Sequence, residues 1–176
     1  ILNFYNKINL VPFGEFLPFE NILKKLGLSV ITNNYQSFSN GDDRKIIKIK
    51  KDDFSLKILP LICYEIIYSG KIFKNQSFDL IVNISEDGWF GTSIGPEQHF
   101  AHSIFRAVEN GKYLLRSSNN GIAAIVNPLG IVEQKVEYGK SGYVDFKKAK
   151  KMQPTLFFKY GNKIFITLIL LYIFMI

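Results

Sequence analysis

The alternation of hydrophobic and polar positions predicts a series of short strands in the first half of this chain. Residues 45–50 read Lys-Ile-Ile-Lys-Ile-Lys, which approximates the period of two that is typical of a half-buried strand. Two mainly apolar runs follow, at residues 54–62 and 80–84. Short strands without a polar face are typical of a sheet that is covered on its faces by helices or by a second sheet.

A helix is predicted to follow these strands, beginning at Gly95-Pro96, because proline near a helix N-terminus loses no hydrogen bond. Apolar side chains recur at helical spacing from Phe100 to Val108. Three further strands, separated by the turn signals Asn-Asn-Gly and Asn-Pro-Leu-Gly, are predicted at residues 113–118, 122–126 and 131–136. This order of elements predicts an α/β sandwich rather than a barrel.

The N-terminal segment carries more signals for turns than for regular structure. Residues 1–18 are predicted to form a short strand and then a loop, because two prolines and a glycine interrupt them. Residues 19–28 are predicted to form one helix, and the polar residues 32–43 a loop.

The C-terminal residues 164–176 carry no charge and are apolar on every face of a helix. A membrane-spanning helix needs about 20 apolar residues, so this run alone is short, and the alternative is a hydrophobic helix docked on the protein. Because no polar face is left to meet water, we expect residues 156–176 to form a truncated transmembrane helix. Lys159, Tyr160 and Lys163 would then lie at the membrane interface.

Composition narrows the class of protein. The chain has 176 residues, enough for one domain with a core, and its 47% hydrophobic residues exclude disorder. The net charge is +7, but only three of the 22 basic residues are arginines and the lysines are scattered, so we expect no nucleic-acid partner. Anionic lipid headgroups suit the excess charge better. The chain begins with Ile rather than Met, so we expect either that a segment has been removed or that the chain is a piece of a longer product.

The only cysteine, Cys63, follows the apolar run Leu-Pro-Leu-Ile and precedes Tyr64 and Glu65. A lone cysteine in a core strand is usually a small hydrophobic residue. An apolar run that delivers one thiol to an aromatic and a carboxylate indicates instead a nucleophile at a strand terminus. Such a thiol reacts as the thiolate, so it needs a nearby cation or base.

Lys7 is the candidate cation if its segment is a neighbour of the Cys63 strand. There it would favour the thiolate and stabilise an oxyanion. Glu15 and Glu65 would hold the ammonium in position. All three residues also have a simpler interpretation, as solvated surface charges in a lysine-rich chain.

Two further patterns bear on a site. Residues 87–91, Asp-Gly-Trp-Phe-Gly, suit the wall of a pocket, although they also fit a turn with aromatic packing. His99 and His102 lie three residues apart on the predicted helix, but the chain has no other histidine, so we expect no metal site. Arg106 and Glu109 are expected to form an ion pair.

Several motifs stand in a fixed order along the chain: Tyr-Asn-Lys-Ile-Asn-Leu-Val-Pro-Phe-Gly-Glu-Phe-Leu-Pro from residue 5, Ile-Cys-Tyr-Glu from 62, Asn-Ile-Ser-Glu-Asp-Gly-Trp-Phe-Gly from 83, Gly-Pro-Glu-Gln-His from 95 and Arg-Ser-Ser-Asn-Asn-Gly from 116. Together they resemble the apolipoprotein N-acyltransferases, the membrane-bound branch of the nitrilase or carbon–nitrogen hydrolase superfamily. The resemblance covers about residues 3–150, and the apolar tail resembles the last membrane helix of that family.

The resemblance implies the C-terminal part of a nitrilase-type α-β-β-α sandwich: a partial domain at residues 1–155 and then a membrane helix at 156–176. It implies a location on the outer, periplasmic side of the bacterial inner membrane. The implied reaction moves a fatty acyl chain from a phospholipid to the N-terminal amino group of a diacylglyceryl-cysteine lipoprotein. No metal or organic cofactor is implied.

By the same resemblance, Cys63 would carry the acyl group as a thioester and Lys7 would stabilise the oxyanion. The other matching positions support the active site (Glu15, Glu65 and Tyr64) or form a loop near the acyl-binding region (Trp89, Phe90 and Gly91).

The family's general base, a glutamate well upstream of the lysine segment, has no counterpart in this sequence. General acid–base help is worth about 10²–10⁴ in rate. We therefore expect a C-terminal fragment, of a split gene or with its upstream half supplied by another polypeptide. Two alternatives remain: a soluble nitrilase-type amidase, against which the apolar C-terminus argues, and a non-catalytic membrane-tethered remnant or subunit, which the missing glutamate favours.

Overall fold

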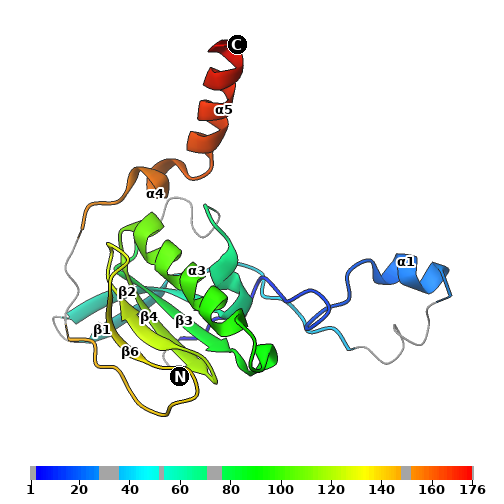
Figure 1. Ribbon diagram of the computed structural model, residues 1–176, viewed down its shortest axis with the longest axis horizontal. Coiled ribbons are helices and arrows are strands. Elements are labelled where there is room, and N and C mark those ends of the chain that lie inside the picture. Colours follow the sequence, from blue (N-terminus) through cyan, green and yellow to red (C-terminus); the bar gives the residue numbers. More distant parts are fainter. Residues whose placement is uncertain (1–2, 28–35, 52–53, 71–76, 148–151, 176) are drawn as a thin grey trace.

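The computed structural model describes residues 3–27, 36–51, 54–70, 77–147 and 152–175. Its centre is one mixed β-sheet, and a long helix, α3, lies along one face of it (Figure 1). The helices α1 and α5 project from this body in different directions (Figure 1).

Six strands of the described residues form the sheet, and their order across it is their order along the chain. They are β1 (Ile47–Lys51), β2 (Phe54–Ile62), β3 (Leu80–Glu86), β4 (Tyr113–Asn119), β5 (Ala123–Val126) and β6 (Val132–Val136). The central strands β2, β3 and β4 are parallel, and the outer pairs are antiparallel. The carboxyl ends of the three central strands therefore meet at one edge of the sheet.

The helices of the described residues are mostly short. They are α1 (Glu20–Lys25), α3 (Gly95–Asn110), α4 (Leu156–Tyr160), α5 (Lys163–Met175) and the 3₁₀ helices η1 (Cys63–Ile67) and η2 (Gly88–Phe90). Parallel strands need a crossover connection, and α3 provides it between β3 and β4. Pro96 lies in the first turn of α3, and Gly111, with φ of 61°, ends it.

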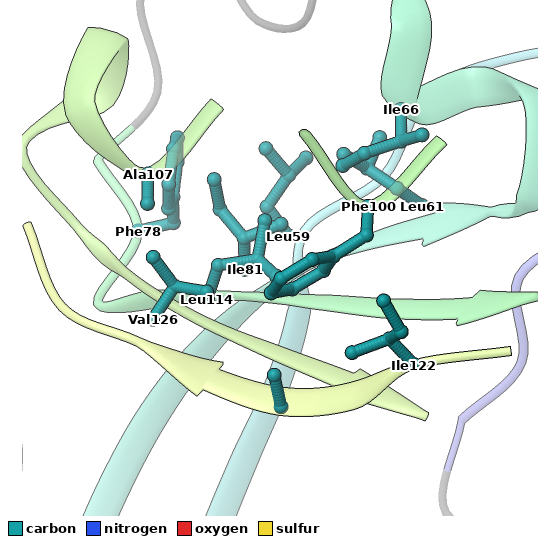
Figure 2. Close-up of a cluster of buried hydrophobic side chains, with 11 residues drawn as sticks. Leu59, Leu61, Ile66, Phe78, Ile81, Phe100, Ala107, Leu114, Ile122 and Val126 are labelled. Atoms are coloured by element: carbon teal, nitrogen blue, oxygen red, sulfur yellow. The ribbon is translucent and has the colours of Figure 1, made fainter. Parts of the chain in front are cut away.

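The main core lies between the sheet and α3. Leu59, Ile81 and Leu114 come from the three parallel strands and meet Phe100 and Ala107 of α3 (Figure 2). All five side chains are buried. Burial of each large aliphatic side chain contributes about 1.5–3 kcal/mol, so this cluster fixes α3 on the sheet.

The opposite face of the sheet carries a smaller cluster, formed by Leu80, Tyr113 and Ile125. Phe146 packs against it, with its ring centroid 5.3 Å from that of Tyr113. Leu80 and its neighbour Ile81 belong to different clusters because successive side chains of a strand point to opposite faces.

The structure confirms the six strands predicted from residue 45 on and the predicted α3, with small displacements of their ends. It also confirms an α/β architecture with a mixed sheet. These elements were predicted because their apolar side chains recur at the period of a strand or a helix, and those side chains pack in the core.

The strand predicted within residues 1–18 is wrong for the described residues 3–18. Pro12 and Phe16 form a lone β-bridge there, and the rest is turns and irregular backbone. The N–H groups of Ile8 and Asn9 donate to the Glu65 side chain instead of to a neighbouring strand.

The predicted helix at residues 19–28 is shorter than expected. It ends at Lys25, and Gly27 follows with φ of 77°, which does not continue a helix; residue 28 lies outside the described residues. Within the predicted loop 32–43, residues 36–43 form no helix or strand, whereas 32–35 lie outside the described residues.

The C-terminal segment forms two helices rather than the single one expected. Gly161, with φ of 55°, separates α4 from α5. Phe158 of α4 packs edge-on against the buried Phe78, with 5.7 Å between ring centroids, whereas the described side chains of α5 are mostly exposed. None of the described helices has both the length and the apolar character needed to cross a membrane, so the transmembrane helix remains a prediction.

Candidate active site

Cys63 lies where β2 ends and η1 begins. Its φ is 49°, a left-handed conformation that costs a non-glycine residue about 1–3 kcal/mol and that is typical of functional sites. The thiol is partly exposed, and Sγ lies 4.0 Å from the main-chain oxygen of Glu86 at the end of β3. The sequence therefore presents its only thiol at the edge where the parallel strands end.

Cys63 opens onto a cavity of about 510 Å³. Its wall combines apolar residues such as Phe38 and Ile67 with a few polar groups, which include Glu15 and His99. A mainly apolar cavity with a few placed polar groups is the usual form of a small-molecule site.

Glu65 is fully buried and connects the N-terminal segment to the nucleophile segment. Its carboxylate accepts hydrogen bonds from the N–H groups of Ile62 (2.8 Å), Ile8 (3.0 Å) and Asn9 (3.2 Å). Arg44 lies 3.4 Å away and balances the charge. This buried carboxylate is satisfied by its neighbours and holds residues 8 and 9 against the start of η1.

Lys7 forms an ion pair with Glu15, with Nζ 2.7 Å from each carboxylate oxygen. Glu15 also accepts a hydrogen bond from the N–H of Val11 at 2.8 Å. Glu15 lines the cavity with Cys63, whereas Lys7 is not among the described residues of its wall. The structure thus brings Cys63 and Glu15 to one cavity, and Glu15 binds the Lys7 ammonium.

The aromatic positions of the site differ in their exposure. Trp89 and Phe90, in η2, and Tyr64 line the cavity. Trp89 is 81% exposed, whereas Phe90 is 39% exposed and packs edge-on against the ring of His99 at 5.6 Å. Gly91, with φ of 55°, forms the turn that follows. Trp89 therefore offers apolar surface at the cavity rim.

The sequence analysis missed a buried network beneath the thiol, formed by Asp87, His99 and Arg116. Asp87 Oδ1 lies 2.8 Å from His99 Nδ1, and Asp87 Oδ2 accepts a hydrogen bond from Arg116 Nη2 at 2.7 Å. His99 Nε2 lies 3.3 Å from the main-chain oxygen of Cys63. A signal was present, since all three residues fall in the segments that carry the family resemblance.

The charge of Asp87 is stabilised by this network. Burial alone would raise the pKa of Asp87, but the hydrogen bond with His99, the charge of Arg116 and the hydroxyls of Ser85 and Ser118 together hold that pKa well below its usual range. Asp87 therefore stays ionised and keeps its partners fixed.

Two smaller predictions concern α3. The ion pair between Arg106 and Glu109 is confirmed, with 2.8 Å between Nη2 and Oε1. In the part of the chain that the structure describes, no group of three His, Cys, Asp or Glu side chains is arranged to hold a metal ion. His99 instead uses its ring nitrogens on Asp87 and Cys63.

Comparison with known proteins places the chain in a family. A family model described as carbon–nitrogen hydrolase matches residues 1–145. The chain belongs to the carbon–nitrogen hydrolase family. This match and the mixed sheet assign it a nitrilase-type α/β fold.

Curated relatives refine this assignment within the carbon–nitrogen hydrolase family. The apolipoprotein N-acyltransferase of Rickettsia bellii is 43% identical over 174 residues, which cover 98% of this chain and 34% of the relative. That of Wigglesworthia glossinidia brevipalpis is 43% identical over 91% of this chain and 32% of its own length. The apolipoprotein N-acyltransferase of Bradyrhizobium diazoefficiens is 37% identical over 92% of this chain and 30% of its own length. The predicted resemblance to these enzymes is confirmed, and the chain spans about a third of their length.

Among solved structures, an amidase from Nesterenkonia sp. AN1 is similar at 16% identity and a TM-score of 0.46, over 77% of this chain and 47% of its own. This likeness is too distant to add to the family assignment.

Proposed function

We propose that this chain carries the acyl group in an N-acyltransferase, which moves a fatty acyl chain from a phospholipid to the N-terminal amino group of a diacylglyceryl-cysteine lipoprotein. The observation that carries this proposal is the left-handed Cys63 at a mainly apolar cavity, with the Lys7–Glu15 pair on one side. The names of the relatives, apolipoprotein N-acyltransferases, support a lipoprotein as the acceptor.

In the first step, the Cys63 thiolate attacks the ester carbonyl of the phospholipid. A carbon–sulfur bond forms, and an electron pair moves to the carbonyl oxygen, where the Lys7 ammonium stabilises it. The carbon–oxygen bond then breaks, and the lysophospholipid leaves as an alkoxide that takes up a proton. The acyl group remains on Cys63 as a thioester.

In the second step, the amino group of the lipoprotein attacks the thioester. A carbon–nitrogen bond forms and the carbon–sulfur bond breaks, so the product is an amide. The proton lost by the amine returns to the Cys63 sulfur, which restores the thiol. Neither step needs an oxidant, a reductant or a cofactor.

The first step needs an acceptor for the thiol proton. At the cavity wall Glu15 is paired with Lys7, and His99 is bound to Asp87. The Glu86 carboxylate also lines the cavity and accepts hydrogen bonds from the Gly88 N–H and the Asn119 side chain. His102 also lines the cavity, and burial, and then the charges of Arg106 and His99, lower its pKa.

The family resemblance implies a general-base glutamate upstream of the lysine segment, and the chain spans about a third of its relatives' length, so we assign the general base to that glutamate, outside this sequence. Glu15 and Glu65 support the site by holding Lys7 and the N-terminal segment. On this proposal the chain is a partial domain (residues 1–155), and acylation without the upstream half is slower by about 10²–10⁴.

The surface of the protein suits a lipid substrate. Trp89 and Phe90 present apolar surface at the cavity, where the acyl chain would lie together with Tyr64 and the turn at Gly91. The exposed apolar side chains of α5 and the net charge of +7 suit attachment to an anionic membrane. We place the site on the outer, periplasmic face of the bacterial inner membrane.

The test supplies both substrates to the detergent-solubilised chain, alone and co-expressed with the upstream half of a relative. The donor is phosphatidylethanolamine of known acyl composition, and the acceptor is a synthetic diacylglyceryl-cysteine peptide. Mass spectrometry should show the peptide gaining one acyl chain with the wild type and none with Cys63→Ala. A folded, co-expressed wild type that leaves the peptide unchanged contradicts the proposal.

An amidase of the same family is the second candidate, because its thiol would attack an amide carbonyl in the same geometry. The fate of the acyl group distinguishes an amidase from an acyltransferase. Release of a free acid and an amine from simple amides, with no transfer to the peptide, favours the amidase, whereas a folded chain inert in both assays favours a non-catalytic subunit.

A further inference from the structure

His99 binds the peptide unit that joins Cys63 to Tyr64. Its Nε2 lies 3.3 Å from the oxygen of that peptide, and a carbonyl oxygen accepts only, so Nε2 carries the proton and donates it. His99 lies on α3, which the core clusters fix against the sheet. A rigid element thus holds the carbonyl of the candidate nucleophile.

The His99 ring has little freedom to move. It is 5% exposed, and its Nδ1 faces Asp87 at 2.8 Å and Arg116 at 3.2 Å. Asp87 is in turn held by Ser85 and Ser118, whose hydroxyls lie 2.7 and 2.8 Å from its oxygens. Because Asp87 and Arg116 are also buried, the position of Nε2 is fixed from behind.

The effect of this contact reaches the other side of the peptide. A trans peptide is planar, and its C=O and N–H groups point in opposite directions. Fixing the carbonyl of Cys63 therefore fixes the direction of the Tyr64 N–H. That N–H lies in the first turn of η1, where a helix leaves its own donors unused.

We propose that His99 is a positioning residue that aims the Tyr64 N–H at the oxyanion formed when Cys63 is acylated. The inference rests on the proposed function, because it requires an acyl transfer at Cys63. The Tyr64 N–H would then donate to the same oxyanion as the Lys7 ammonium. In this role His99 acts through the peptide rather than on the reacting atoms.

The inference separates two reactions of the same thiol. Attack on an ester builds an oxyanion, which needs the aimed N–H, whereas alkylation by iodoacetamide displaces iodide and builds none. A change that merely displaces Cys63 would slow both reactions. A change that only misdirects the Tyr64 N–H should slow acylation and leave alkylation unchanged.

The experiment measures both rates by intact-mass spectrometry, with p-nitrophenyl butyrate and with iodoacetamide, at pH 9.5, where thiols in general are largely ionised. The variants are His99→Leu, which has no donor, and His99→Gln, whose amide nitrogen stands the same number of bonds from the backbone as Nε2. Asn110→Leu is the matched control, since Asn110 is also buried on α3 and bonds a carbonyl, that of Arg106.

We expect His99→Leu to slow acylation about tenfold or more while alkylation stays within about twofold of the wild type. His99→Gln should recover most of the acylation rate, and Asn110→Leu should match the wild type in both. Equal slowing of both reactions in His99→Leu, or no slowing of either, overturns the role of His99 alone. A wild type that is alkylated but never acylated at Cys63 overturns the proposed function, and the role of His99 with it.

Discussion

The hydroxyl of Tyr5 lies 2.9 and 3.1 Å from the two carboxylate oxygens of Glu65, which stands two residues after the thiol. Burial, opposed by the charge of Arg44 and assisted by that of Glu65, raises the pKa of Tyr5 well above its ordinary value, so the hydroxyl stays a donor. This contact joins the start of the lysine segment to the nucleophile segment, which no strand pairing does among the described residues.

Tyr5→Phe should therefore destabilise the protein by about 1.5–3 kcal/mol, because it removes a hydrogen bond to a charged, buried acceptor. Urea unfolding followed by circular dichroism measures the change. Tyr143→Phe is the matched control, since Tyr143 is 88% exposed, and it should leave the unfolding midpoint unchanged. Equal midpoints for the two variants would show that the Tyr5 contact does not hold the segment.

Lys7→Met should slow acylation of Cys63 by about 10²–10³, because the oxyanion loses a cationic donor. Methionine is unbranched and uncharged, and its side chain is one atom shorter than that of lysine. The comparison is Lys135→Met, which breaks only an exposed ion pair with Glu137. Rates within a factor of two for both variants, measured with p-nitrophenyl butyrate, would rule out the role of Lys7.

The stability of the protein should fall in acid through Asp87. The folded state lowers the pKa of Asp87, so its ionised form adds stability at any pH above the ordinary aspartate value near 4. That contribution is lost as pH falls from about 4 toward the lower folded pKa, because the unfolded chain binds the proton first.

Asp87→Asn should remove this dependence. At pH 7 the variant should be about 3–5 kcal/mol less stable, since Arg116 keeps a buried charge without its counterion. Between pH 5 and pH 2.5 its free energy of unfolding should change less than that of the wild type. Asp145→Asn, at an exposed position, should follow the wild-type curve. Parallel curves for wild type and Asp87→Asn would contradict the assignment.

Much of the fold was accessible from pattern alone. The apolar run before Cys63 predicted both a strand and its end, because packing on both faces of the sheet enforces that pattern. The N-terminal segment was not accessible in this way. Residues 8 and 9 look like part of a strand, but their N–H groups bind Glu65, a residue more than 50 positions away.

The sequence predicted individual residues of the site better than the contacts between them. Cys63 and Glu15 meet at one cavity, as the resemblance implies for a shared site. The network of Asp87, His99 and Arg116 was missed because each residue lies on a different element and their meeting depends on the order of the strands. The partners of His99 are a carboxylate and a main-chain carbonyl, so the spacing of the two histidines does not indicate its role.

Leu114→Ala tests the core between the sheet and α3. Leu114 is fully buried on β4, so the variant should lose about 2–5 kcal/mol through lost apolar contacts and the cavity left behind. Leu129→Ala, at a position 66% exposed, should change stability by less than about 0.5 kcal/mol. Thermal or urea unfolding measures the stability of both variants. If Leu114→Ala is as stable as Leu129→Ala, α3 is not packed on the sheet as described.

The central claim is that Cys63 carries an acyl group as a thioester, and intact-mass spectrometry tests it most directly. The detergent-solubilised chain is incubated with phosphatidylethanolamine at pH 9.5, beside Cys63→Ala. We predict that the wild type gains the mass of one fatty acyl chain, that hydroxylamine removes it, and that Cys63→Ala gains nothing. A folded wild type that gains no mass, or an equal gain by Cys63→Ala, would contradict the claim.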